Sequence, residues 1–334
     1  MRLLVTGATG LLGSHLVEEL VKDGHQVTGL VHRRRPPRLD VSWLQGDVTQ
    51  PDFGLEVLQY PAIDRDLKPD ALVHCAGMVK FTESRALHLA NVYGVNNAVQ
   101  LALQWRIPLF HVSTAYVAGD PAWSPLPPST LDCKPRNAYE RSKQQAELII
   151  RNTSGLEYCI FRPSILVGDS KLVGLPPPQG LYQGVKAFAV VKRWAERRMG
   201  LPALIPRLRL RGDPEAHINL IPVDLAARQM ASLISQNARG SFHLVNEQPP
   251  TLEEVLQAVS HALEADIQVM PDLDPNPAER LLALLLRDLL PYLQGEPVFC
   301  NESTQALVPA ESRCRGLDPN FIEATTRHFL RTKR

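Results

Sequence analysis

The sequence lacks an excess of charge of either sign. It contains 36 Lys and Arg against 35 Asp and Glu, a formal net charge of +1 over 334 residues. Proteins that bind nucleic acids or anionic membranes usually carry a strongly basic surface. We therefore expect no nucleic-acid partner, and any basic surface must be local.

Paired cysteines and long hydrophobic runs are also absent. The five cysteines are scattered and form no CxxC pair, which argues against a disulfide framework and against a bound metal. The apolar stretch "LLALLLRDLLPYL" (281–293) is interrupted by Arg287 and Asp288 and is too short to span a bilayer. The chain starts directly with the apolar run "RLLVTGA", with no leader pattern before it. We expect a cytoplasmic protein without a transmembrane segment.

Short β-rich runs alternate with helical patterns over the first 170 residues. The β-rich runs are "RLLVTGA", "HQVTGLVH", "VSWLQGD", "DALVHCAG", "PLFHVST" and "EYCIFRPS". Helical patterns cover 11–23, 84–104 and 137–152. This alternation is typical of a parallel sheet covered by helices on both faces. It predicts an α/β fold with a Rossmann-type doubly wound parallel sheet.

The composition changes beyond residue 170. Residues 171–216 are rich in Gly, Pro and basic residues, whereas 217–246 return to a strand-and-helix pattern. We predict that residues 1–170, completed by 217–246, form the Rossmann domain. Residues 171–216 and 247–334 are predicted to form a smaller, mostly helical, substrate-binding lobe.

A glycine-rich turn follows the first β-rich run. "VTGATGLLG" places Gly7, Gly10 and Gly13 between a strand and a helix, with the spacing GxxGxxG. Glycine lets the turn close and lets the backbone approach a pyrophosphate, whose charge then lies at the helix N-terminus. A plain glycine turn is the alternative, but the position favours a dinucleotide-binding loop.

The end of the second strand discriminates between NAD and NADP. NAD sites favour an acid there, whereas the 2′-phosphate of NADP favours arginine. "LVHRRRPPR" has no acid before Asp40, and Arg33 and Arg34 are the first candidates for the phosphate contact. The pattern therefore predicts NADP(H). Asp47 and Val48 end the third strand, where the adenine would lie, although a turn-capping role for Asp47 is an equal alternative.

The stretch "NAYERSKQQAE" (137–147) places Tyr139 and Lys143 four residues apart on one face of a predicted helix. An ordinary phenol is a weak acid at neutral pH, and a nearby ammonium stabilises its ionised form. A surface pairing is the alternative to a catalytic acid with a neighbouring cation.

These motifs resemble a known family, the extended short-chain dehydrogenases/reductases. "TGATGLLG", "DALVHCAG", "NVYGVNNAVQLA", "HVSTAYVAG", "NAYERSK" and "FRPSILVG" stand in that family's order and approximate spacing. Within the family, "VHCAGMVKF", "RPSILVGDS", "GLYQG" and "NLIPVDLAA" look most like fatty acyl-CoA reductases and the thioester-reductase domains of peptide and polyketide synthases.

The resemblance implies a role for each matching residue. Tyr139 would donate a proton to the substrate oxygen, and Lys143 would hold the nicotinamide ribose. Thr114 would hydrogen-bond the substrate carbonyl, with Ser113 as the fallback, and Asn91 would organise a proton relay. Further cofactor contacts are assigned to Thr9, Leu11, Ala76, Gly77, Pro163 and Ser164. Substrate contacts are assigned to Lys80, Phe81, Tyr182 and Tyr292.

The implied function is an NADPH-dependent reductase of an acyl thioester, carried on CoA or on an acyl carrier protein, which yields an aldehyde or alcohol. An NADP-dependent ketone or alcohol oxidoreductase with the same residues is the second reading. A non-catalytic NADP-binding regulator is the third, and the intact Tyr–Lys pair argues against it.

Residues 186–211 contain eight basic residues against one acid, Glu196. A face that gathers them would suit the phosphates of CoA or an acidic carrier protein. Peripheral membrane contact by this helix and a plain solvated helix are the alternatives. The oligomeric state is open, and a homodimer is among the options.

Overall fold

The computed structural model describes residues 1–32, 40–55, 68–119, 124–131, 133–171, 180–199 and 207–332. Arg33 and Arg34 lie outside the described residues. The chain divides into two compact units. The first comprises Met1–Pro163, Asp224–Leu244 and Phe299–Arg313, and the second comprises Ser164–Val223, Val245–Val298 and Cys314–Arg334.

The first unit contains a seven-stranded sheet in the order β10-β6-β5-β4-β1-β2-β3. Every neighbouring pair in this sheet is parallel. The strands are β1 (Arg2–Thr6), β2 (Gln26–Val31), β3 (Ser42–Gln45), β4 (Ala71–His74), β5 (Leu109–Val112), β6 (Tyr158–Pro163) and β10 (Gly240–Leu244). Their order and direction confirm the predicted Rossmann-type sheet.

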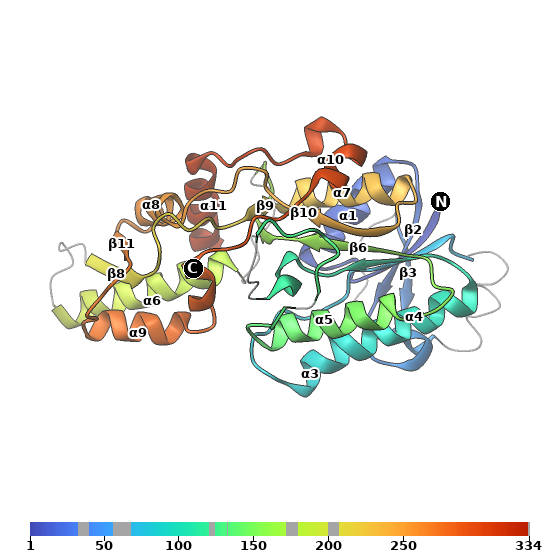
Figure 1. Ribbon diagram of the computed structural model, residues 1–334, viewed down its shortest axis with the longest axis horizontal. Coiled ribbons are helices and arrows are strands. Elements are labelled where there is room, and N and C mark those ends of the chain that lie inside the picture. Colours follow the sequence, from blue (N-terminus) through green and yellow to red (C-terminus); the bar gives the residue numbers. More distant parts are fainter. Residues whose placement is uncertain are drawn as a thin grey trace. The chain divides into compact units, whose positions relative to one another are not determined.

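Helices cover both faces of this sheet. In Figure 1, α4 (Gly94–Trp105) and α5 (Ala138–Arg151) lie on one face, and α1 (Leu11–Lys22) and α7 (Val223–Ser235) lie on the other. A short helix, α3 (Arg85–His88), leads into α4 through one π-helical turn, Leu89–Tyr93. Apolar side chains of the strands pack under α4 and α5, so these two helices are held firmly against the sheet.

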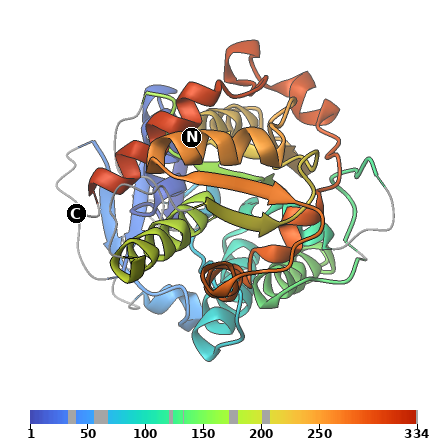
Figure 2. The same ribbon diagram turned by 90° about the vertical axis from the view of Figure 1, so that its left-hand side faces the viewer.

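The second unit is built around the strand pair β8 (Arg207–Arg211) and β11 (Asp266–Met270). Figure 2 shows α8 (Leu252–Leu263) and α11 (Pro319–Thr332) on one side of this pair. The other side carries α6 (Leu181–Met199) and α9 (Pro277–Leu286). A second pair joins β7 (Ile165–Val167) to β9 (Leu220–Pro222). Capping boxes fix the starts of α8 and α9.

The units differ from the predicted domain boundaries at residues 164–170, 217–223 and 245–246, which belong to the second unit, and in one larger segment. Residues 299–313, which we predicted in the C-terminal lobe, belong to the first unit. The Phe299 ring packs edge-on against Tyr116 and His243, and the Cys300 amide donates to the Leu126 carbonyl at 2.8 Å. In α10 (Glu302–Leu307), the Thr304 hydroxyl donates to the carbonyl of His243 at 2.8 Å. These contacts tie the segment to β10 and to the loops beside the sheet.

None of the helices in the described ranges combines the length and hydropathy needed to cross a membrane. The same ranges contain no group of three His, Cys, Asp or Glu side chains placed to hold a metal ion.

Candidate active site

The glycine turn between β1 and α1 leaves no room for side chains. Gly7 has φ +66°, and a Cβ atom on it would lie 2.6 Å from the Ala76 nitrogen. A Cβ atom on Gly13 would lie 2.1 Å from the Gly7 carbonyl oxygen. Glycine is therefore required at both positions so that the turn can close against β4 and the start of α1.

The start of α1 suits an anion. Gly10 precedes the helix, no side chain caps its first N–H groups, and its first turn holds no acidic residue. Of the predicted contact residues at this turn, Thr9 is exposed and Leu11 is partly exposed. The positive end of the helix and its amide groups therefore fit the pyrophosphate of a dinucleotide.

Asp47 follows β3 and caps a turn. Its Oδ1 accepts hydrogen bonds from the amide and the hydroxyl of Thr49 at 2.9 and 2.8 Å. The His32 Nε2 atom, at the end of β2, lies 3.5 Å from its Oδ2. The carbonyl of the next residue, Val48, accepts from the Asn97 amide at 2.9 Å. Of the two readings left open for Asp47, the turn-capping role is present, and the cofactor contact stays a prediction.

Helix α5 presents Tyr139 and Lys143 to the carboxyl end of the sheet. Asn137 caps the helix by accepting from the Glu140 amide at 3.0 Å. Tyr139 is partly exposed, and its ring packs edge-on against Phe81 with ring centres 6.2 Å apart. Lys143 is only 5% exposed, and its Nζ donates to the Val112 carbonyl at 2.9 Å.

Burial dominates the acidity of both groups. It lowers the pKa of Lys143 to about 8, against opposing effects of Cys75 and Glu147. It raises the pKa of Tyr139 to about 12, although a hydrogen bond with the Thr114 hydroxyl acts in the opposite direction. We expect the lysine to lower the pKa of the phenol, but burial outweighs such an effect and the net shift is upward. Tyr139 is therefore a protonated phenol at neutral pH.

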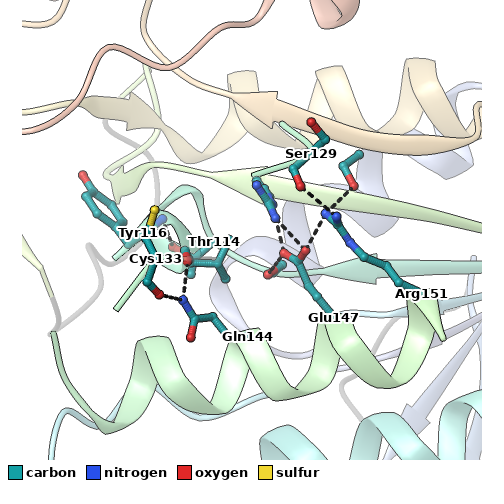
Figure 3. A network of polar contacts seen from close by, with 11 residues as sticks. Thr114, Tyr116, Ser129, Cys133, Gln144, Glu147 and Arg151 are labelled. Atoms are coloured by element: carbon teal, nitrogen blue, oxygen red, sulfur yellow. Dashed lines mark hydrogen bonds and ion pairs between the residues drawn. The ribbon is translucent and has the colours of Figure 1, made fainter. Parts of the chain in front are cut away.

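Thr114 and Ser113 have different surroundings, which Figure 3 shows in part for Thr114. Thr114 caps the short 3₁₀ helix Ala115–Ala118, where its Oγ1 accepts from the Tyr116 amide at 3.3 Å. The same hydroxyl lies 3.5 Å from the Pro163 carbonyl and is the one that interacts with Tyr139. The hydroxyl of Ser113 instead donates to Glu147 at 2.6 Å. Between the two candidates, the geometry favours Thr114 as the group beside Tyr139.

Asn91 lies on the π-helical turn and is fully buried. Its side chain accepts from the Met78 amide at 2.7 Å and donates to the Met78 carbonyl at 2.9 Å. It also donates to the Ser142 hydroxyl at 2.9 Å, and Ser142 in turn donates to the Tyr139 carbonyl at 2.7 Å. Asn91 thus fixes the loop after β4 against α5, a placement common for π-bulges at functional sites.

Gly77, in the loop after β4, keeps a gap next to these groups. A Cβ atom at this position would lie 3.2 Å from the Lys143 Nζ and 3.3 Å from the Asn91 Oδ1. Gly77 is exposed, and Ala76 beside it donates its amide to the Thr6 hydroxyl at 3.2 Å. Ala76 thus borders the glycine turn and Gly77 borders Lys143, and their cofactor contacts stay predictions.

The predicted substrate residues fall into two groups. Phe81 lies beside Tyr139, its carbonyl accepts from the Ala138 amide at 3.1 Å, and its neighbour Lys80 is exposed. Tyr182 belongs to the second unit and is completely buried there. Its hydroxyl is hydrogen-bonded to Thr325 at 2.5 Å and to the Gly168 amide at 3.0 Å. These contacts give Tyr182 a structural role, and its substrate contact stays a prediction.

Two further predicted residues also lie in the second unit. Tyr292 is 7% exposed, on the 3₁₀ turn Leu290–Gln294. Ser164 is 5% exposed, and its hydroxyl has no hydrogen-bond partner within the described ranges. Their proposed contacts stay predictions.

The family is decided by a comparison with known proteins. The model of the NAD dependent epimerase/dehydratase family matches residues 3–246. The chain belongs to this family. Membership confirms the resemblance to extended short-chain dehydrogenases/reductases, and with it the class of NAD(P)-dependent oxidoreductases. The description of this family as NAD dependent makes a nicotinamide dinucleotide the family's cofactor.

Several relatives are parts of much longer synthetases. The hybrid PKS-NRPS synthetase pydA of an Acremonium species is 34% identical over 58% of this chain and 5% of its own length. A linear gramicidin synthase of Brevibacillus parabrevis is 23% identical over 98% of this chain and 7% of its own length. Aldehyde reductase lnaA of Aspergillus flavus is 24% identical over 85% of this chain and 30% of its own length. The chain thus spans less than a third of each relative.

Solved structures share the fold. The terminal R domain from the myxalamid PKS-NRPS biosynthetic pathway has a TM-score of 0.78 at 24% identity, covering 99% of this chain and 90% of that one. UDP-glucose 4-epimerase of Thermus thermophilus, in complex with NAD, has a TM-score of 0.67 at 22% identity and covers 99% of both chains.

A polar network surrounds Glu147 (Figure 3), and the sequence analysis did not predict it. Glu147 and its partner Arg162 are both completely buried, with 0% of each residue exposed. Two signals point to them. Glu147 continues the four-residue spacing from Lys143, and Arg162 is a charged residue inside the apolar run "YCIFRPS". A charge on a buried strand requires a buried partner.

Proposed function

We propose that the chain is an NADPH-dependent reductase of an acyl thioester and produces an aldehyde or an alcohol. The observation that carries the proposal is the meeting of three groups at the carboxyl end of the sheet. The Thr114 hydroxyl lowers the pKa of the Tyr139 phenol against the effect of burial, and the buried Lys143 ammonium lies one helical turn away on α5, next to Gly77. This is a proton donor, a carbonyl-binding hydroxyl and a cation in one place.

Each group has a chemical task in this reaction. The nicotinamide, when bound, supplies a hydride to the thioester carbonyl carbon. Tyr139, which burial keeps protonated with a pKa of about 12, donates its proton to the oxygen as negative charge develops there. Thr114 donates a second hydrogen bond to the same oxygen. The C–S bond then breaks, the carbonyl re-forms as an aldehyde, and the sulfur leaves as a thiol. A second hydride would give the alcohol.

The proposed cofactor preference is NADP(H). Its support is the arginine run after β2, where an acid would favour NAD. Arg33 and Arg34 are the proposed contacts of the 2′-phosphate. Measuring the dissociation constants of NADPH and NADH for the parent and for Arg33→Ala and Arg34→Ala tests this preference. A loss confined to NADPH supports it, and equal constants for both cofactors contradict it.

The proposed substrate is a thioester on a carrier protein or on CoA. Its support is the similarity to hybrid PKS-NRPS synthetases and to a terminal R domain, together with the sequence motifs that resemble those of thioester-reductase domains. The five cysteines are scattered in the sequence and form no CxxC pair, which suits a reducing compartment, and we propose the cytoplasm. A ketone or aldehyde reductase is the second candidate, because the relative lnaA is named an aldehyde reductase.

The test is NADPH consumption by the purified protein with acyl-CoAs, acyl-pantetheine thioesters, carrier-bound acyl thioesters, aldehydes and ketones. Thioester-dependent turnover that disappears in Tyr139→Phe supports the proposal. The matched control is Tyr158→Phe at the start of β6, which should keep full turnover. Turnover with aldehydes or ketones alone favours the second candidate. Tight NADPH binding without turnover on any substrate contradicts both.

A further inference from the structure

The inward face of α5 carries a third group beyond Tyr139 and Lys143. Glu147 follows Lys143 by four residues and is fully buried. Its Oε1 accepts from the Ser113 hydroxyl at 2.6 Å and from the Arg162 Nε at 2.9 Å. Its Oε2 accepts from the Arg162 Nη2 at 2.7 Å and from the Arg151 Nη2 at 3.0 Å. One carboxylate thus receives four hydrogen bonds, three of them from arginine.

The partners of Glu147 are direct neighbours of the proposed site residues. Ser113 precedes Thr114 at the end of β5, and its amide donates to the Phe161 carbonyl at 2.7 Å. Arg162 precedes Pro163 at the end of β6, and the Pro163 carbonyl lies 3.5 Å from the Thr114 hydroxyl. The carboxylate therefore joins α5 to the two strand ends that border it.

We propose that Glu147 is a positioning residue, which holds Lys143 on α5 in register with Thr114, just beyond the end of β5, through Ser113 and Arg162. That this placement of Lys143 relative to Thr114 matters for catalysis rests on the proposed function. Charge-assisted hydrogen bonds are shorter and more directional than neutral ones, and a bidentate arginine fixes the plane of the carboxylate. Figure 3 shows Glu147 and Arg151 on α5, together with the Ser129 segment, whose carbonyl accepts from Arg151 at 2.8 Å.

Glu147 also acts on Lys143 through its charge. The groups that influence Lys143 electrostatically are Cys75 and His74 near the end of β4, His111 on β5, and Glu147 on its own helix. Burial lowers the pKa of His74 to about 3 and that of His111 well below its usual range, so both rings are neutral. Burial raises the pKa of Cys75 to about 12, so this thiol is neutral as well. Glu147, which accepts three hydrogen bonds from arginine, is the anionic member of this set.

Tyr139 is the remaining titratable neighbour on α5, and burial keeps it neutral too. Arg162 and Arg151 form ion pairs with Glu147 and carry the opposite charge. A positioning role with this charge pattern makes a directional prediction. Removal of the Glu147 charge lowers the proton affinity of Lys143, whereas removal of the Arg151 charge raises it.

The experiment is a pH titration of Lys143 by NMR, with the lysines of the chain labelled with ¹³C at the ε-carbon. The nine lysines give nine signals, and the signal missing in Lys143→Arg is that of Lys143. In Glu147→Gln, which keeps an acceptor for Ser113, the proton affinity should fall on the order of tenfold. In Arg151→Gln it should rise by a smaller factor. Ser241→Ala, which removes a neutral partner of Arg151 and changes no charge, is the control and should leave the midpoint in place.

Unchanged midpoints in both charge variants, or shifts in the same direction, would overturn the proposal. Arg151 is partly exposed, with 20% of its side chain accessible, so Arg151→Gln keeps the test decisive if Glu147→Gln does not fold. The titration requires neither substrate nor turnover. A failed reductase assay with the expected opposite shifts therefore contradicts the proposed function and not the positioning role.

Discussion

Ser113 and Thr114 are neighbours in the chain, but their hydroxyl groups serve different parts of the structure. The Ser113 hydroxyl donates to the buried Glu147 carboxylate at 2.6 Å, below the site. The Thr114 hydroxyl interacts with Tyr139 and lies 3.5 Å from the Pro163 carbonyl. Adjacent residues at a strand end point to opposite sides, so one of the two can face a substrate while the other fixes the helix behind it.

This difference predicts a separation of activity from stability. Thr114→Val removes a hydrogen bond to the developing oxyanion, and turnover should fall by about 10²- to 10³-fold with little change in unfolding. Ser113→Ala removes one donor from a buried carboxylate and should lower the free energy of unfolding by about 1–3 kcal/mol. Steady-state kinetics and urea unfolding of both variants provide the test. Equal losses of turnover in the two variants would contradict the assignment of Thr114.

The fold could be predicted from the sequence because its signals are local. The glycine turn and the alternation of β-rich runs with helical patterns fixed the order of the elements, and parallel strands with covering helices follow from them. The spacing of Tyr139 and Lys143 likewise placed both on one face of α5. What the spacing could not supply is the direction of the lysine, which donates to Val112, because that contact joins residues 31 positions apart.

Burial of Lys143 predicts a conflict between stability and function. The pKa of about 8 lies below the usual value of 10.5, so the folded chain loses this proton at lower pH than the unfolded chain. Stability should therefore rise between pH 8 and 10.5, and at pH 7 the buried charge costs roughly 3 kcal/mol. Lys143→Met removes that cost together with the bond to Val112.

The most informative measurement on Lys143→Met is how its difference in unfolding free energy from the parent changes with pH. Relative to the parent, the stability of the variant should decrease by roughly 3 kcal/mol between pH 7 and pH 10.5, while turnover is lost throughout. Urea unfolding of both proteins across this range measures the change. A difference that stays constant with pH would show that Lys143 keeps its ordinary proton affinity in the fold.

Gly77 predicts a variant that affects cofactor binding alone. Its backbone angles are open to alanine, since it is not among the glycines with positive φ. The added Cβ of Gly77→Ala would occupy the gap beside Lys143 and Asn91. NADPH binding should weaken by about tenfold or more, roughly 1.4 kcal/mol, with the melting temperature nearly unchanged. Gly184→Ala on α6, where the nearest atom is 4.0 Å away, is the control and should bind NADPH like the parent.

The Glu147–Arg162 pair predicts strong coupling in unfolding. Loss of either partner leaves an unpaired buried charge, so Glu147→Leu and Arg162→Met should each cost about 3–5 kcal/mol. The double variant should be more stable than either single one, because both charges are then absent. Arg141 on the same helix pairs with Glu83 at the surface, and removal of that pair should change stability little. Additive losses in the buried pair would contradict this account.

The limits of the sequence analysis are clearest at Tyr182 and in the basic segment. The motif "GLYQG" indicated a pocket residue, but the bonds of Tyr182 to Thr325 and Gly168 depend on distant parts of the chain. Part of the basic segment, residues 186–211, likewise depends on distant partners. Arg207 and Arg209 pair with Asp266 and Glu279, which no local pattern announces.

The remaining part of the basic segment gives the last prediction. Lys186, Arg193 and Arg197 are exposed on α6 at positions that share one face of the helix, with the exposed Val190 between them. Three cations around an apolar residue suit the surface of an acidic carrier protein. Charge reversal at all three positions should raise the KM for a carrier-bound thioester about tenfold or more at low salt, with a smaller effect at high salt.

A small pantetheine thioester distinguishes docking from chemistry in this variant. It has no carrier surface to bind, so its turnover should match that of the parent. Lys22→Glu on α1 reverses an exposed charge in the first unit and should leave both substrates unaffected. A loss of equal size with the small thioester would show that these cations support the fold or the active site rather than docking. No loss with the carrier-bound thioester would show that the carrier binds to a surface other than α6.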